Sequence, residues 1–162
     1  MNKLIILLWF LVACALPKAY AEGNELPRQI LGIQLNITKD EARKRLEKIG
    51  NFVREEEHQE VWQVRDESFS HLIVGFDKDE KVRYVTAVAR EDKEAKRIEY
   101  KKVGDLKKAR QAGDPKVKNF NYQWNLPATK EQSHMLVIAA GRDPKFLTTF
   151  SLKNPNAQKE ED

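Results

Sequence analysis

Three histidines are the residues of this chain that could act as metal ligands or as a general base. They are His58, His71 and His134, and the single cysteine is Cys14. Zinc sites take three or four ligands at local spacings such as H-x-x-x-H or C-x-x-C, and the sequence contains neither pattern. We therefore expect no metal and no cofactor. A small periplasmic hydrolase or metal-handling protein using His71 and His134 stays as an alternative, because both residues fall near the starts of corresponding predicted strands.

Nucleophilic catalysis has no recognisable motif in this chain. A serine or threonine nucleophile needs a base within reach, and neither G-x-S-x-G nor S-x-x-K nor a glycine-rich phosphate loop occurs. Ser70 and His71 are neighbours in a predicted strand. Because successive strand residues point to opposite faces, this pair is not expected to form a dyad. We predict that the protein is not an enzyme.

A short acidic run begins like a calcium-binding loop. Asp77, Asp79 and Lys81 have the spacing of its first positions. Such a loop needs glycine at its sixth position and glutamate at its twelfth, and these places hold Val82 and Val88. The run is therefore predicted to be a hairpin turn.

A basic segment followed by aromatic residues is the best candidate binding surface. Residues 101–118 carry seven cationic side chains against two aspartates, and three aromatic residues follow within six positions. Such a surface could bind anionic lipid headgroups, a polyanion or an acidic protein. Alternatively, the lysines coat the outside of an amphipathic helix while Tyr122 or Trp124 packs inward. The candidate binding residues are Lys101, Lys102, Lys107, Lys108, Arg110, Lys116, Lys118 and Tyr122.

The first 21 residues have the pattern of a secretory signal peptide. Lys3 precedes an apolar run over 4–16, and Ala19 and Ala21 supply the small residues of a cleavage site after Ala21. The run is too short for a membrane-spanning helix, which needs roughly 20 apolar residues. We expect export to the periplasm or the medium. Alternatively, residues 11–14 resemble a bacterial lipobox, and an acylated Cys14 would anchor the protein to the outer membrane.

The composition is that of a globular protein and argues against nucleic-acid binding. The chain has 162 residues, of which 41% are hydrophobic and 33% charged, as expected for one ordinary domain or two very small ones. Without residues 1–21 it carries 27 basic and 25 acidic side chains, so the net charge falls from +4 to +2. This near-balance in an exported protein argues against nucleic-acid binding.

Short helices and strands alternate along the rest of the chain. Thr38 and Glu41 form a capping box for a helix that is expected to end at Gly50 as a C′ residue. A second helix is predicted over 105–112, before Gly113. Strands are predicted at 61–64, 69–76, 81–88, 120–124, 134–140 and 146–152, with Leu136 and Ile138 among the core residues. The expected fold class is α+β, with short helices packed on an antiparallel sheet.

The two halves of the chain show the same order of features, which predicts an internal duplication of one unit. Gly50 matches Gly113 after a helix, Trp62 matches Trp124 in a strand, and the Asp79 turn matches a turn at Asp143, at offsets of 63, 62 and 64 residues. The predicted organisation is a signal peptide at 1–21, a first unit at 22–90, a second at 91–152 and a disordered tail at 153–162.

One stretch resembles a known family. Thr38-x-x-Glu41 opens a short helix, Gly50 closes it, Trp62 lies in a strand, and Leu72 to Val82 reads L-I-V-G-F-D-K-D-E-K-V. This order is similar to the SmpA/OmlA (BamE-like) domain of bacterial envelope proteins, which are exported and often lipid-anchored. The resemblance implies helices on a three-stranded antiparallel sheet. The two-unit arrangement further resembles the β-lactamase-inhibitory protein, which uses tandem units as a concave binding face.

Together these features predict an exported, non-enzymatic envelope protein. We expect it to bind a protein or another envelope component through its exposed sheet face, with the basic segment at the rim. No nucleic acid and no small-molecule substrate is indicated. A lipid-anchored structural lipoprotein is the further alternative, and it depends on Cys14.

Overall fold

A computed structural model describes residues 25–130 and 132–155 of the chain. The predicted signal peptide, its cleavage position at Ala21, Cys14 and the last seven residues lie outside the described parts. The elements, in which η marks a 3-10 helix, follow one another as α1 (Lys39–Ile49), β1 (Gly50–Glu56), β2 (Gln59–Val64), β3 (Phe69–Phe76), β4 (Val82–Ala89), α2 (Tyr100–Val103), η1 (Leu106–Lys108), β5 (Arg110–Gln111), η2 (Pro115–Val117), β6 (Phe120–Leu126), β7 (Met135–Gly141) and β8 (Thr149–Lys153).

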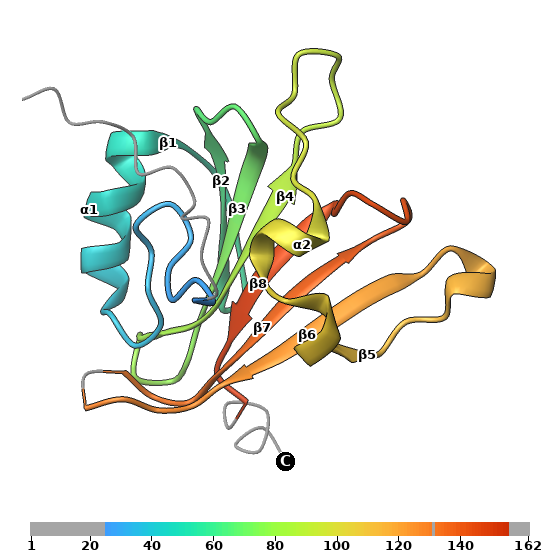
Figure 1. The fold of residues 1–162 in the computed structure, drawn as a ribbon. Coiled ribbons are helices and arrows are strands. Elements are labelled where there is room, and N and C mark those ends of the chain that lie inside the picture. The colour runs from blue at the N-terminus through green and yellow to red at the C-terminus, as the bar shows by residue number, and fades with distance from the viewer. Residues whose placement is uncertain (1–24, 131, 156–162) are drawn as a thin grey trace, which may run out of the picture.

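The strands form one antiparallel sheet of eight, in the order β1-β2-β3-β4-β8-β7-β6-β5 (Figure 1). The predicted α+β class is therefore wrong, and the protein is mainly β, because α1 is the only helix of the described residues that is longer than four residues. The helix predicted over 105–112 forms only η1, which buries no residue, and the two-residue strand β5. A short helix in water depends on packing an apolar face, and in this segment only Ala109 packs against the core while Leu106 is exposed.

Helix α1 begins as its sequence predicts and ends differently. The Thr38 hydroxyl accepts a hydrogen bond from the Glu41 amide, which confirms the N-cap, and Ala42 and Leu46 are buried. Gly50 is not a left-handed C′ residue, because its φ of −163° is extended and it opens β1 directly. Glycine is required there for a different reason. A Cβ on Gly50 would lie 2.2 Å from the backbone oxygen of Gln63 in the neighbouring strand.

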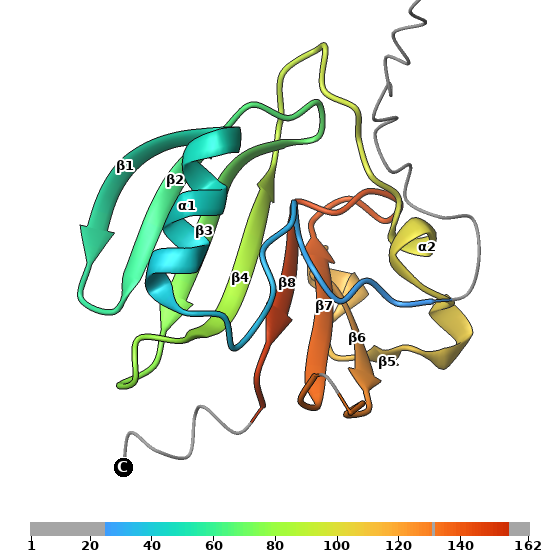
Figure 2. The same ribbon diagram turned by 90° about the vertical axis from the view of Figure 1, so that its left-hand side faces the viewer.

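The core lies between one face of the sheet and the elements that cover it. Figure 2 shows α1, the segment leading into it and α2 on the same side. Leu136 and Ile138, expected in this core, face the other side, whereas Val137 and Ala139 are fully buried. The buried sheet residues of the covered face include Trp62, Leu72, Val74, Val85, Ala87, Trp124, Val137, Ala139, Phe150 and Leu152.

Backbone contacts repeat between the two halves of the sheet. The Val82 amide donates to the Ile37 carbonyl at 2.9 Å, and the Leu147 amide donates to the Ile98 carbonyl at 3.1 Å. Each of these bonds joins the residue two positions before a helix to the segment that follows a hairpin turn. The predicted match of Gly50 and Gly113 as residues after a helix is wrong, since Gly113 follows β5.

Strands β4 and β8 join the halves with a symmetric register. Residues 65 apart occupy equivalent places, so Val85 corresponds to Phe150 and Ala87 to Leu152. Val85 pairs with Leu152, and Ala87 pairs with Phe150. If each residue is replaced by its equivalent in the other half, the first pair becomes the second, so the set of pairs stays the same. A pseudo-twofold axis therefore passes between the two strands. Descent from a duplicated unit, with boundaries at 22–90 and 91–152, stays a prediction, while the predicted tail at 153–162 begins inside β8.

Candidate functional site

The sheet face opposite the helices is the candidate functional site, and we call it the open face. Residues paired across antiparallel strands share a face, so the register defines three rows that cross six strands. The rows are Gln59, Gly75, Tyr84, Lys153, Leu136 and Asn125; Val61, Ile73, Thr86, Ser151, Ile138 and Gln123; and Gln63, His71, Val88, Thr149, Ala140 and Asn121.

The open face is almost free of formal charge. Lys153 is the one Lys, Arg, Asp or Glu of the three rows, although such residues make up 33% of the chain, and the Arg83 guanidinium reaches the same end of the face beside Tyr84. A solvated face of an antiparallel sheet normally alternates polar side chains with the apolar ones of the core. Here the side chains of Ile73, Tyr84, Val88, Leu136 and Ile138 are half-exposed among hydroxyl and amide groups, whereas Val61 and Ser151 are buried. Charges return at the two edge strands, with Arg54 and Glu56 on β1 and Arg110 on β5.

The pseudo-twofold axis passes through the centre of the open face. Thr86 pairs with Ser151, and the two residues are each other's equivalents. Their hydroxyl oxygens lie 2.8 Å apart. Ile73 and Ile138 lie one strand further out on either side, at equivalent positions. The middle of the face is thus a hydroxyl pair flanked by two half-exposed isoleucines.

Tyr84 is the aromatic residue of the open face. Its hydroxyl donates to the amide oxygen of Gln59. The Arg83 guanidinium carbon and the Lys153 ammonium lie 5.5 and 5.8 Å from its ring centroid. These contacts fix the orientation of the ring at one end of the face.

The structure does not place the predicted basic segment around this face. Lys101 and Lys102 lie on α2, whose Tyr100 and Val103 pack into the covered core. Lys107 and Lys108 lie on η1, and Lys116 and Lys118 lie on and just after η2. Of the predicted binding residues, only Arg110 is assigned to the open face, because it pairs with Gln123.

Tyr122 packs inward instead of forming part of a binding surface. It belongs to the covered face, and its ring centroid lies 4.9 Å from that of buried Tyr100. Burial is the main cause that raises the pKa of Tyr100 to about 12, with smaller contributions from Tyr122 and Asp143. Its hydroxyl donates to the Asp143 carbonyl at 3.1 Å. The inward alternative considered for Tyr122 is thus the one observed.

Ser70 and His71 contact each other, contrary to the expectation that they point apart. The register of β3 shifts between Phe69 and His71, and the Ser70 hydroxyl oxygen lies 3.1 Å from His71 Nδ1. That hydroxyl also donates to the Val88 carbonyl at 3.3 Å. When the hydroxyl donates its proton to the Val88 carbonyl, it can only accept from His71, in the tautomer that carries a hydrogen on Nδ1. In that arrangement Nδ1 cannot act as a base toward Ser70.

The histidines of the alternative hypothesis lie apart. His71 belongs to the row that meets β7 at Ala140, whereas His134 precedes Met135 at the opposite end of β7. His58 and His134 are exposed. Within the described residues there is no group of three or more His, Cys, Asp or Glu that could hold a metal ion.

The run that begins like a calcium loop is a hairpin turn, as predicted. Asp77 Oδ1 accepts from the amides of Asp79 and Lys81, both at 2.9 Å. Asp143 Oδ1 accepts from two amides in the β7–β8 turn in the same way. Those two backbone bonds are the main cause that lowers the pKa of Asp143. Both aspartates therefore stabilise equivalent turns.

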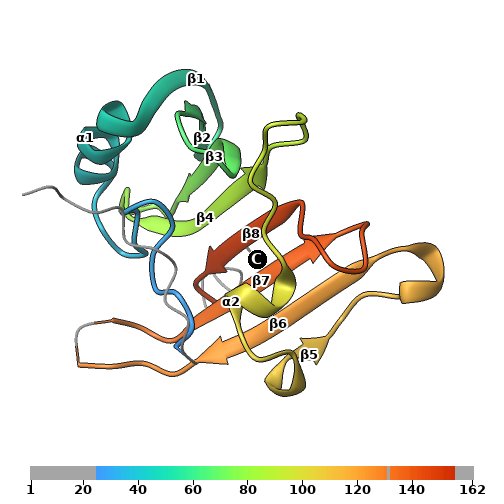
Figure 3. The ribbon, with the colours of Figure 1, turned by 45° about the horizontal axis from the view of Figure 1, so that its top comes forward.

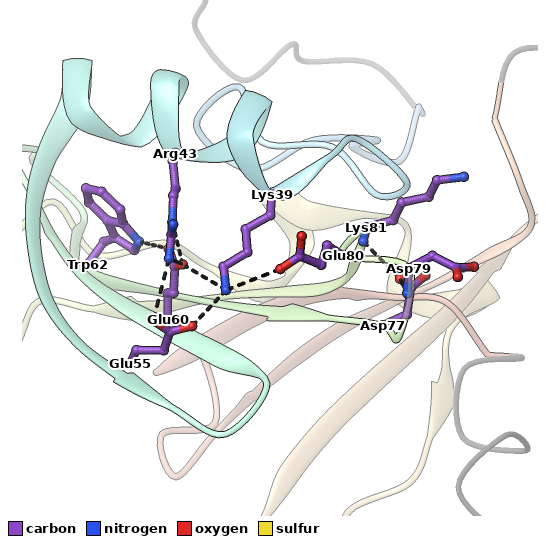
Figure 4. Close-up of polar contacts among 9 residues, drawn as sticks. All are labelled: Lys39, Arg43, Glu55, Glu60, Trp62, Asp77, Asp79, Glu80 and Lys81. Carbon is purple, nitrogen blue, oxygen red and sulfur yellow. Dashed lines mark hydrogen bonds and ion pairs between the residues drawn. The ribbon is translucent and has the colours of Figure 1, made fainter.

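A buried carboxylate lies between α1 and the sheet, and the sequence analysis did not identify it. Glu60 is wholly buried and accepts from Arg43 Nε at 2.7 Å and from Trp62 Nε1 at 2.9 Å (Figure 4). Lys39 lies 3.8 Å from Glu60 and 2.7 Å from Glu55. The hydrogen bond to Glu60 is the main cause that raises the pKa of Arg43, and that from Lys39 lowers the pKa of Glu55. Because both Glu60 oxygens are satisfied, the group holds α1 to β2.

Comparisons with known proteins add no relative to this description. No protein-family model, curated protein sequence or solved structure matches the chain. No helix among the described residues is long and apolar enough to cross a membrane.

Proposed function

We propose that this is an exported, non-enzymatic protein that binds another folded protein through its open face. The observation that carries the proposal is the near absence of charge over the three rows that cross β2, β3, β4, β8, β7 and β6. The centre of a protein–protein interface is depleted of charged residues and enriched in tyrosine. Exposed apolar surface rimmed by polar groups is typical of such interfaces.

The dimensions of the open face suit a protein partner. Six strands about 4.8 Å apart, with five residues along each, cover roughly 500 Å² with side-chain margins. A stable interface buries about 800 Å² on each partner, so the partner must also reach the edge strands. Arg54 on β1 and Arg110 on β5 would then meet carboxylates of the partner. Such rim charges steer the encounter and select the partner.

The location of the protein is part of the proposal and rests on residues 1–21. Cleavage after Ala21 gives a soluble protein of the periplasm or the medium, whereas acylation of Cys14 gives an outer-membrane lipoprotein. The intact mass of the protein from its native envelope fraction separates the two. A mass that begins at Glu22 supports the first form, and a mass that begins at Cys14 plus acyl chains supports the second.

Site-specific photo-crosslinking in the producing cells tests the binding function. A crosslinking residue is placed at Ile73, at its equivalent Ile138, and at Lys44, which is exposed on α1. We expect one protein to be captured from both open-face positions and not from Lys44. Ile73→Lys with Ile138→Lys should abolish its binding to the purified protein while the thermal unfolding midpoint stays close to that of the wild type. Equal capture from all three positions, or none from the open face, would refute the proposal.

A further inference from the structure

Apart from Arg110, which lies at the edge of the open face, the basic segment at residues 101–118 lies outside that face. All seven of its cationic side chains are exposed. Five of them, Lys107, Lys108, Arg110, Lys116 and Lys118, have no ion-pair partner among the residues that the structure describes. The two carboxylates of the segment cap the short helices: Asp105 accepts from the Lys107 amide at 3.0 Å and Asp114 from the Lys116 amide at 2.9 Å.

The same segment exposes apolar side chains next to these charges. Val117 is 71% exposed and Leu106 is 37% exposed, and they are two of the four large apolar residues exposed in the described chain. Val117 lies on η2 between Lys116 and Lys118. The β5–β6 connection that carries η2 extends away from the rest of the sheet (Figures 1 and 3). An apolar side chain is thus held at the tip of a projecting basic arm.

The chemistry of the segment favours a lipid surface over a protein partner. Six of its seven cations are lysines. Lysine is depleted from protein–protein interfaces, where the planar arginine fork is preferred. A layer of anionic headgroups needs only point charges within a Debye length, and an apolar residue between them can enter the headgroup region.

We propose that residues 101–118 dock on the surface of a bilayer that contains anionic phospholipid, with Val117 inserted at headgroup depth. This goes beyond the proposed function, because the lysines that carry it lie outside the open face. Lys107 and Lys108 lie on η1, and the carbonyl of Asp105 just before it accepts from Trp124 Nε1 of the covered face, while Lys116 and Lys118 belong to the β5–β6 connection. Docking would therefore leave the rows of the open face available for a protein.

Vesicle co-sedimentation of the exported protein, recovered from cells that express the full chain, tests the proposal. Vesicles of phosphatidylcholine are compared with vesicles of equal parts phosphatidylcholine and phosphatidylglycerol. We expect binding to the anionic vesicles well above that to the neutral ones, and binding that weakens as salt is added. Each basic residue near an anionic surface raises affinity about fivefold, so Lys116→Glu with Lys118→Glu should lower it at least about 25-fold.

Two further variants separate docking from a general effect of net charge. Lys44→Glu with Lys48→Glu makes the same charge change on the exposed side of α1, and we expect a much smaller loss. Val117→Ser keeps every charge and should weaken binding about tenfold, because it removes the inserted apolar group. Equal binding to both vesicle types, or equal losses in the two charge variants, would overturn the proposal. Neither result would affect the crosslinking expected from Ile73 and Ile138.

Discussion

The guanidinium of Arg43 on α1 lies 2.7 Å from a carboxylate oxygen of Glu60, which is wholly buried in β2. The second oxygen accepts from Trp62 Nε1, so this glutamate connects the helix, the sheet and the core. A charge removed from water to this extent is tolerated only while its partners remain.

Arg43→Ala should therefore be strongly destabilising. It leaves the Glu60 carboxylate with Trp62 and the more distant Lys39, and we expect a loss of about 3 kcal/mol in the free energy of unfolding. Chemical denaturation at neutral pH measures it. Arg54→Ala is the matched control, because Arg54 forms an exposed pair with Glu56, and such pairs contribute only about 0.5 kcal/mol. Equal losses in the two variants would contradict the role of Glu60.

Replacement by alanine should destabilise the protein to different extents at Gly50 and at Gly32, because the backbone surroundings of the two glycines differ. At Gly50 the φ is extended, and the added Cβ would lie 2.2 Å from Gln63 O, so the strands β1 and β2 must separate. We expect Gly50→Ala to cost about 3 kcal/mol, the upper end of what overpacking typically costs, because the clash is with backbone. At Gly32 the φ is +83° and no atom lies within 4 Å of the added Cβ. Gly32→Ala should cost about 1 kcal/mol, the cost of a left-handed alanine.

Thermal unfolding of both glycine variants measures this difference. Gly50→Ala should lower the unfolding midpoint more than Gly32→Ala does. The reverse order would contradict the close approach of β1 and β2.

Neighbouring residues of β7 should differ in their contribution to stability. Val137 is fully buried on the covered face, and Val137→Ala should cost about 2–3 kcal/mol. Ile138 lies on the open face, so Ile138→Ala should cost only about 1 kcal/mol although it removes more atoms. Urea denaturation of the two variants measures the difference. A larger loss of stability in Ile138→Ala than in Val137→Ala would contradict the observation that Val137, and not Ile138, faces the core.

Tyr100 should make the stability depend on pH in alkaline solution. Burial raises the pKa of its phenol to about 12, and that of an unfolded tyrosine is about 10. The folded state thus favours the protonated phenol, and this stabilisation is complete below pH 10 and lost as the pH rises toward 12.

The test is the thermal unfolding midpoint between pH 8 and pH 12 in the wild type and in Tyr100→Phe. The variant loses the hydrogen bond to the Asp143 carbonyl and should be less stable at pH 8, but its midpoint should fall less steeply above pH 10. Parallel profiles would contradict a perturbed Tyr100, because the two proteins differ only in this phenol.

The sequence by itself determined those elements whose caps, turns and buried faces are set by residues close together in the chain. The capping box at Thr38, the burial of Ala42 and Leu46, and the turn at Asp77 are set by residues three or four positions apart. In β3, alternation predicts Leu72 and Val74 on one face and Ile73 on the other, as observed, but it also predicts Phe69 beside Ile73, and Phe69 is fully buried because the register shifts between Phe69 and His71. Period-two patterning suffices where one face is apolar and the other is not.

Only the tertiary structure decided the fold class and most of the open face. Strand β7 is apolar throughout, so its sequence shows no period, and the pairing of Val137 with Leu152 determines which side chains are buried. Strand β1 was missed because it is an exposed edge strand without alternating apolar residues. The meeting of Thr86 with Ser151, 65 positions away, depends on β4 pairing with β8. Long-range strand pairing depends on the burial of the whole sheet face, which no local window of sequence contains.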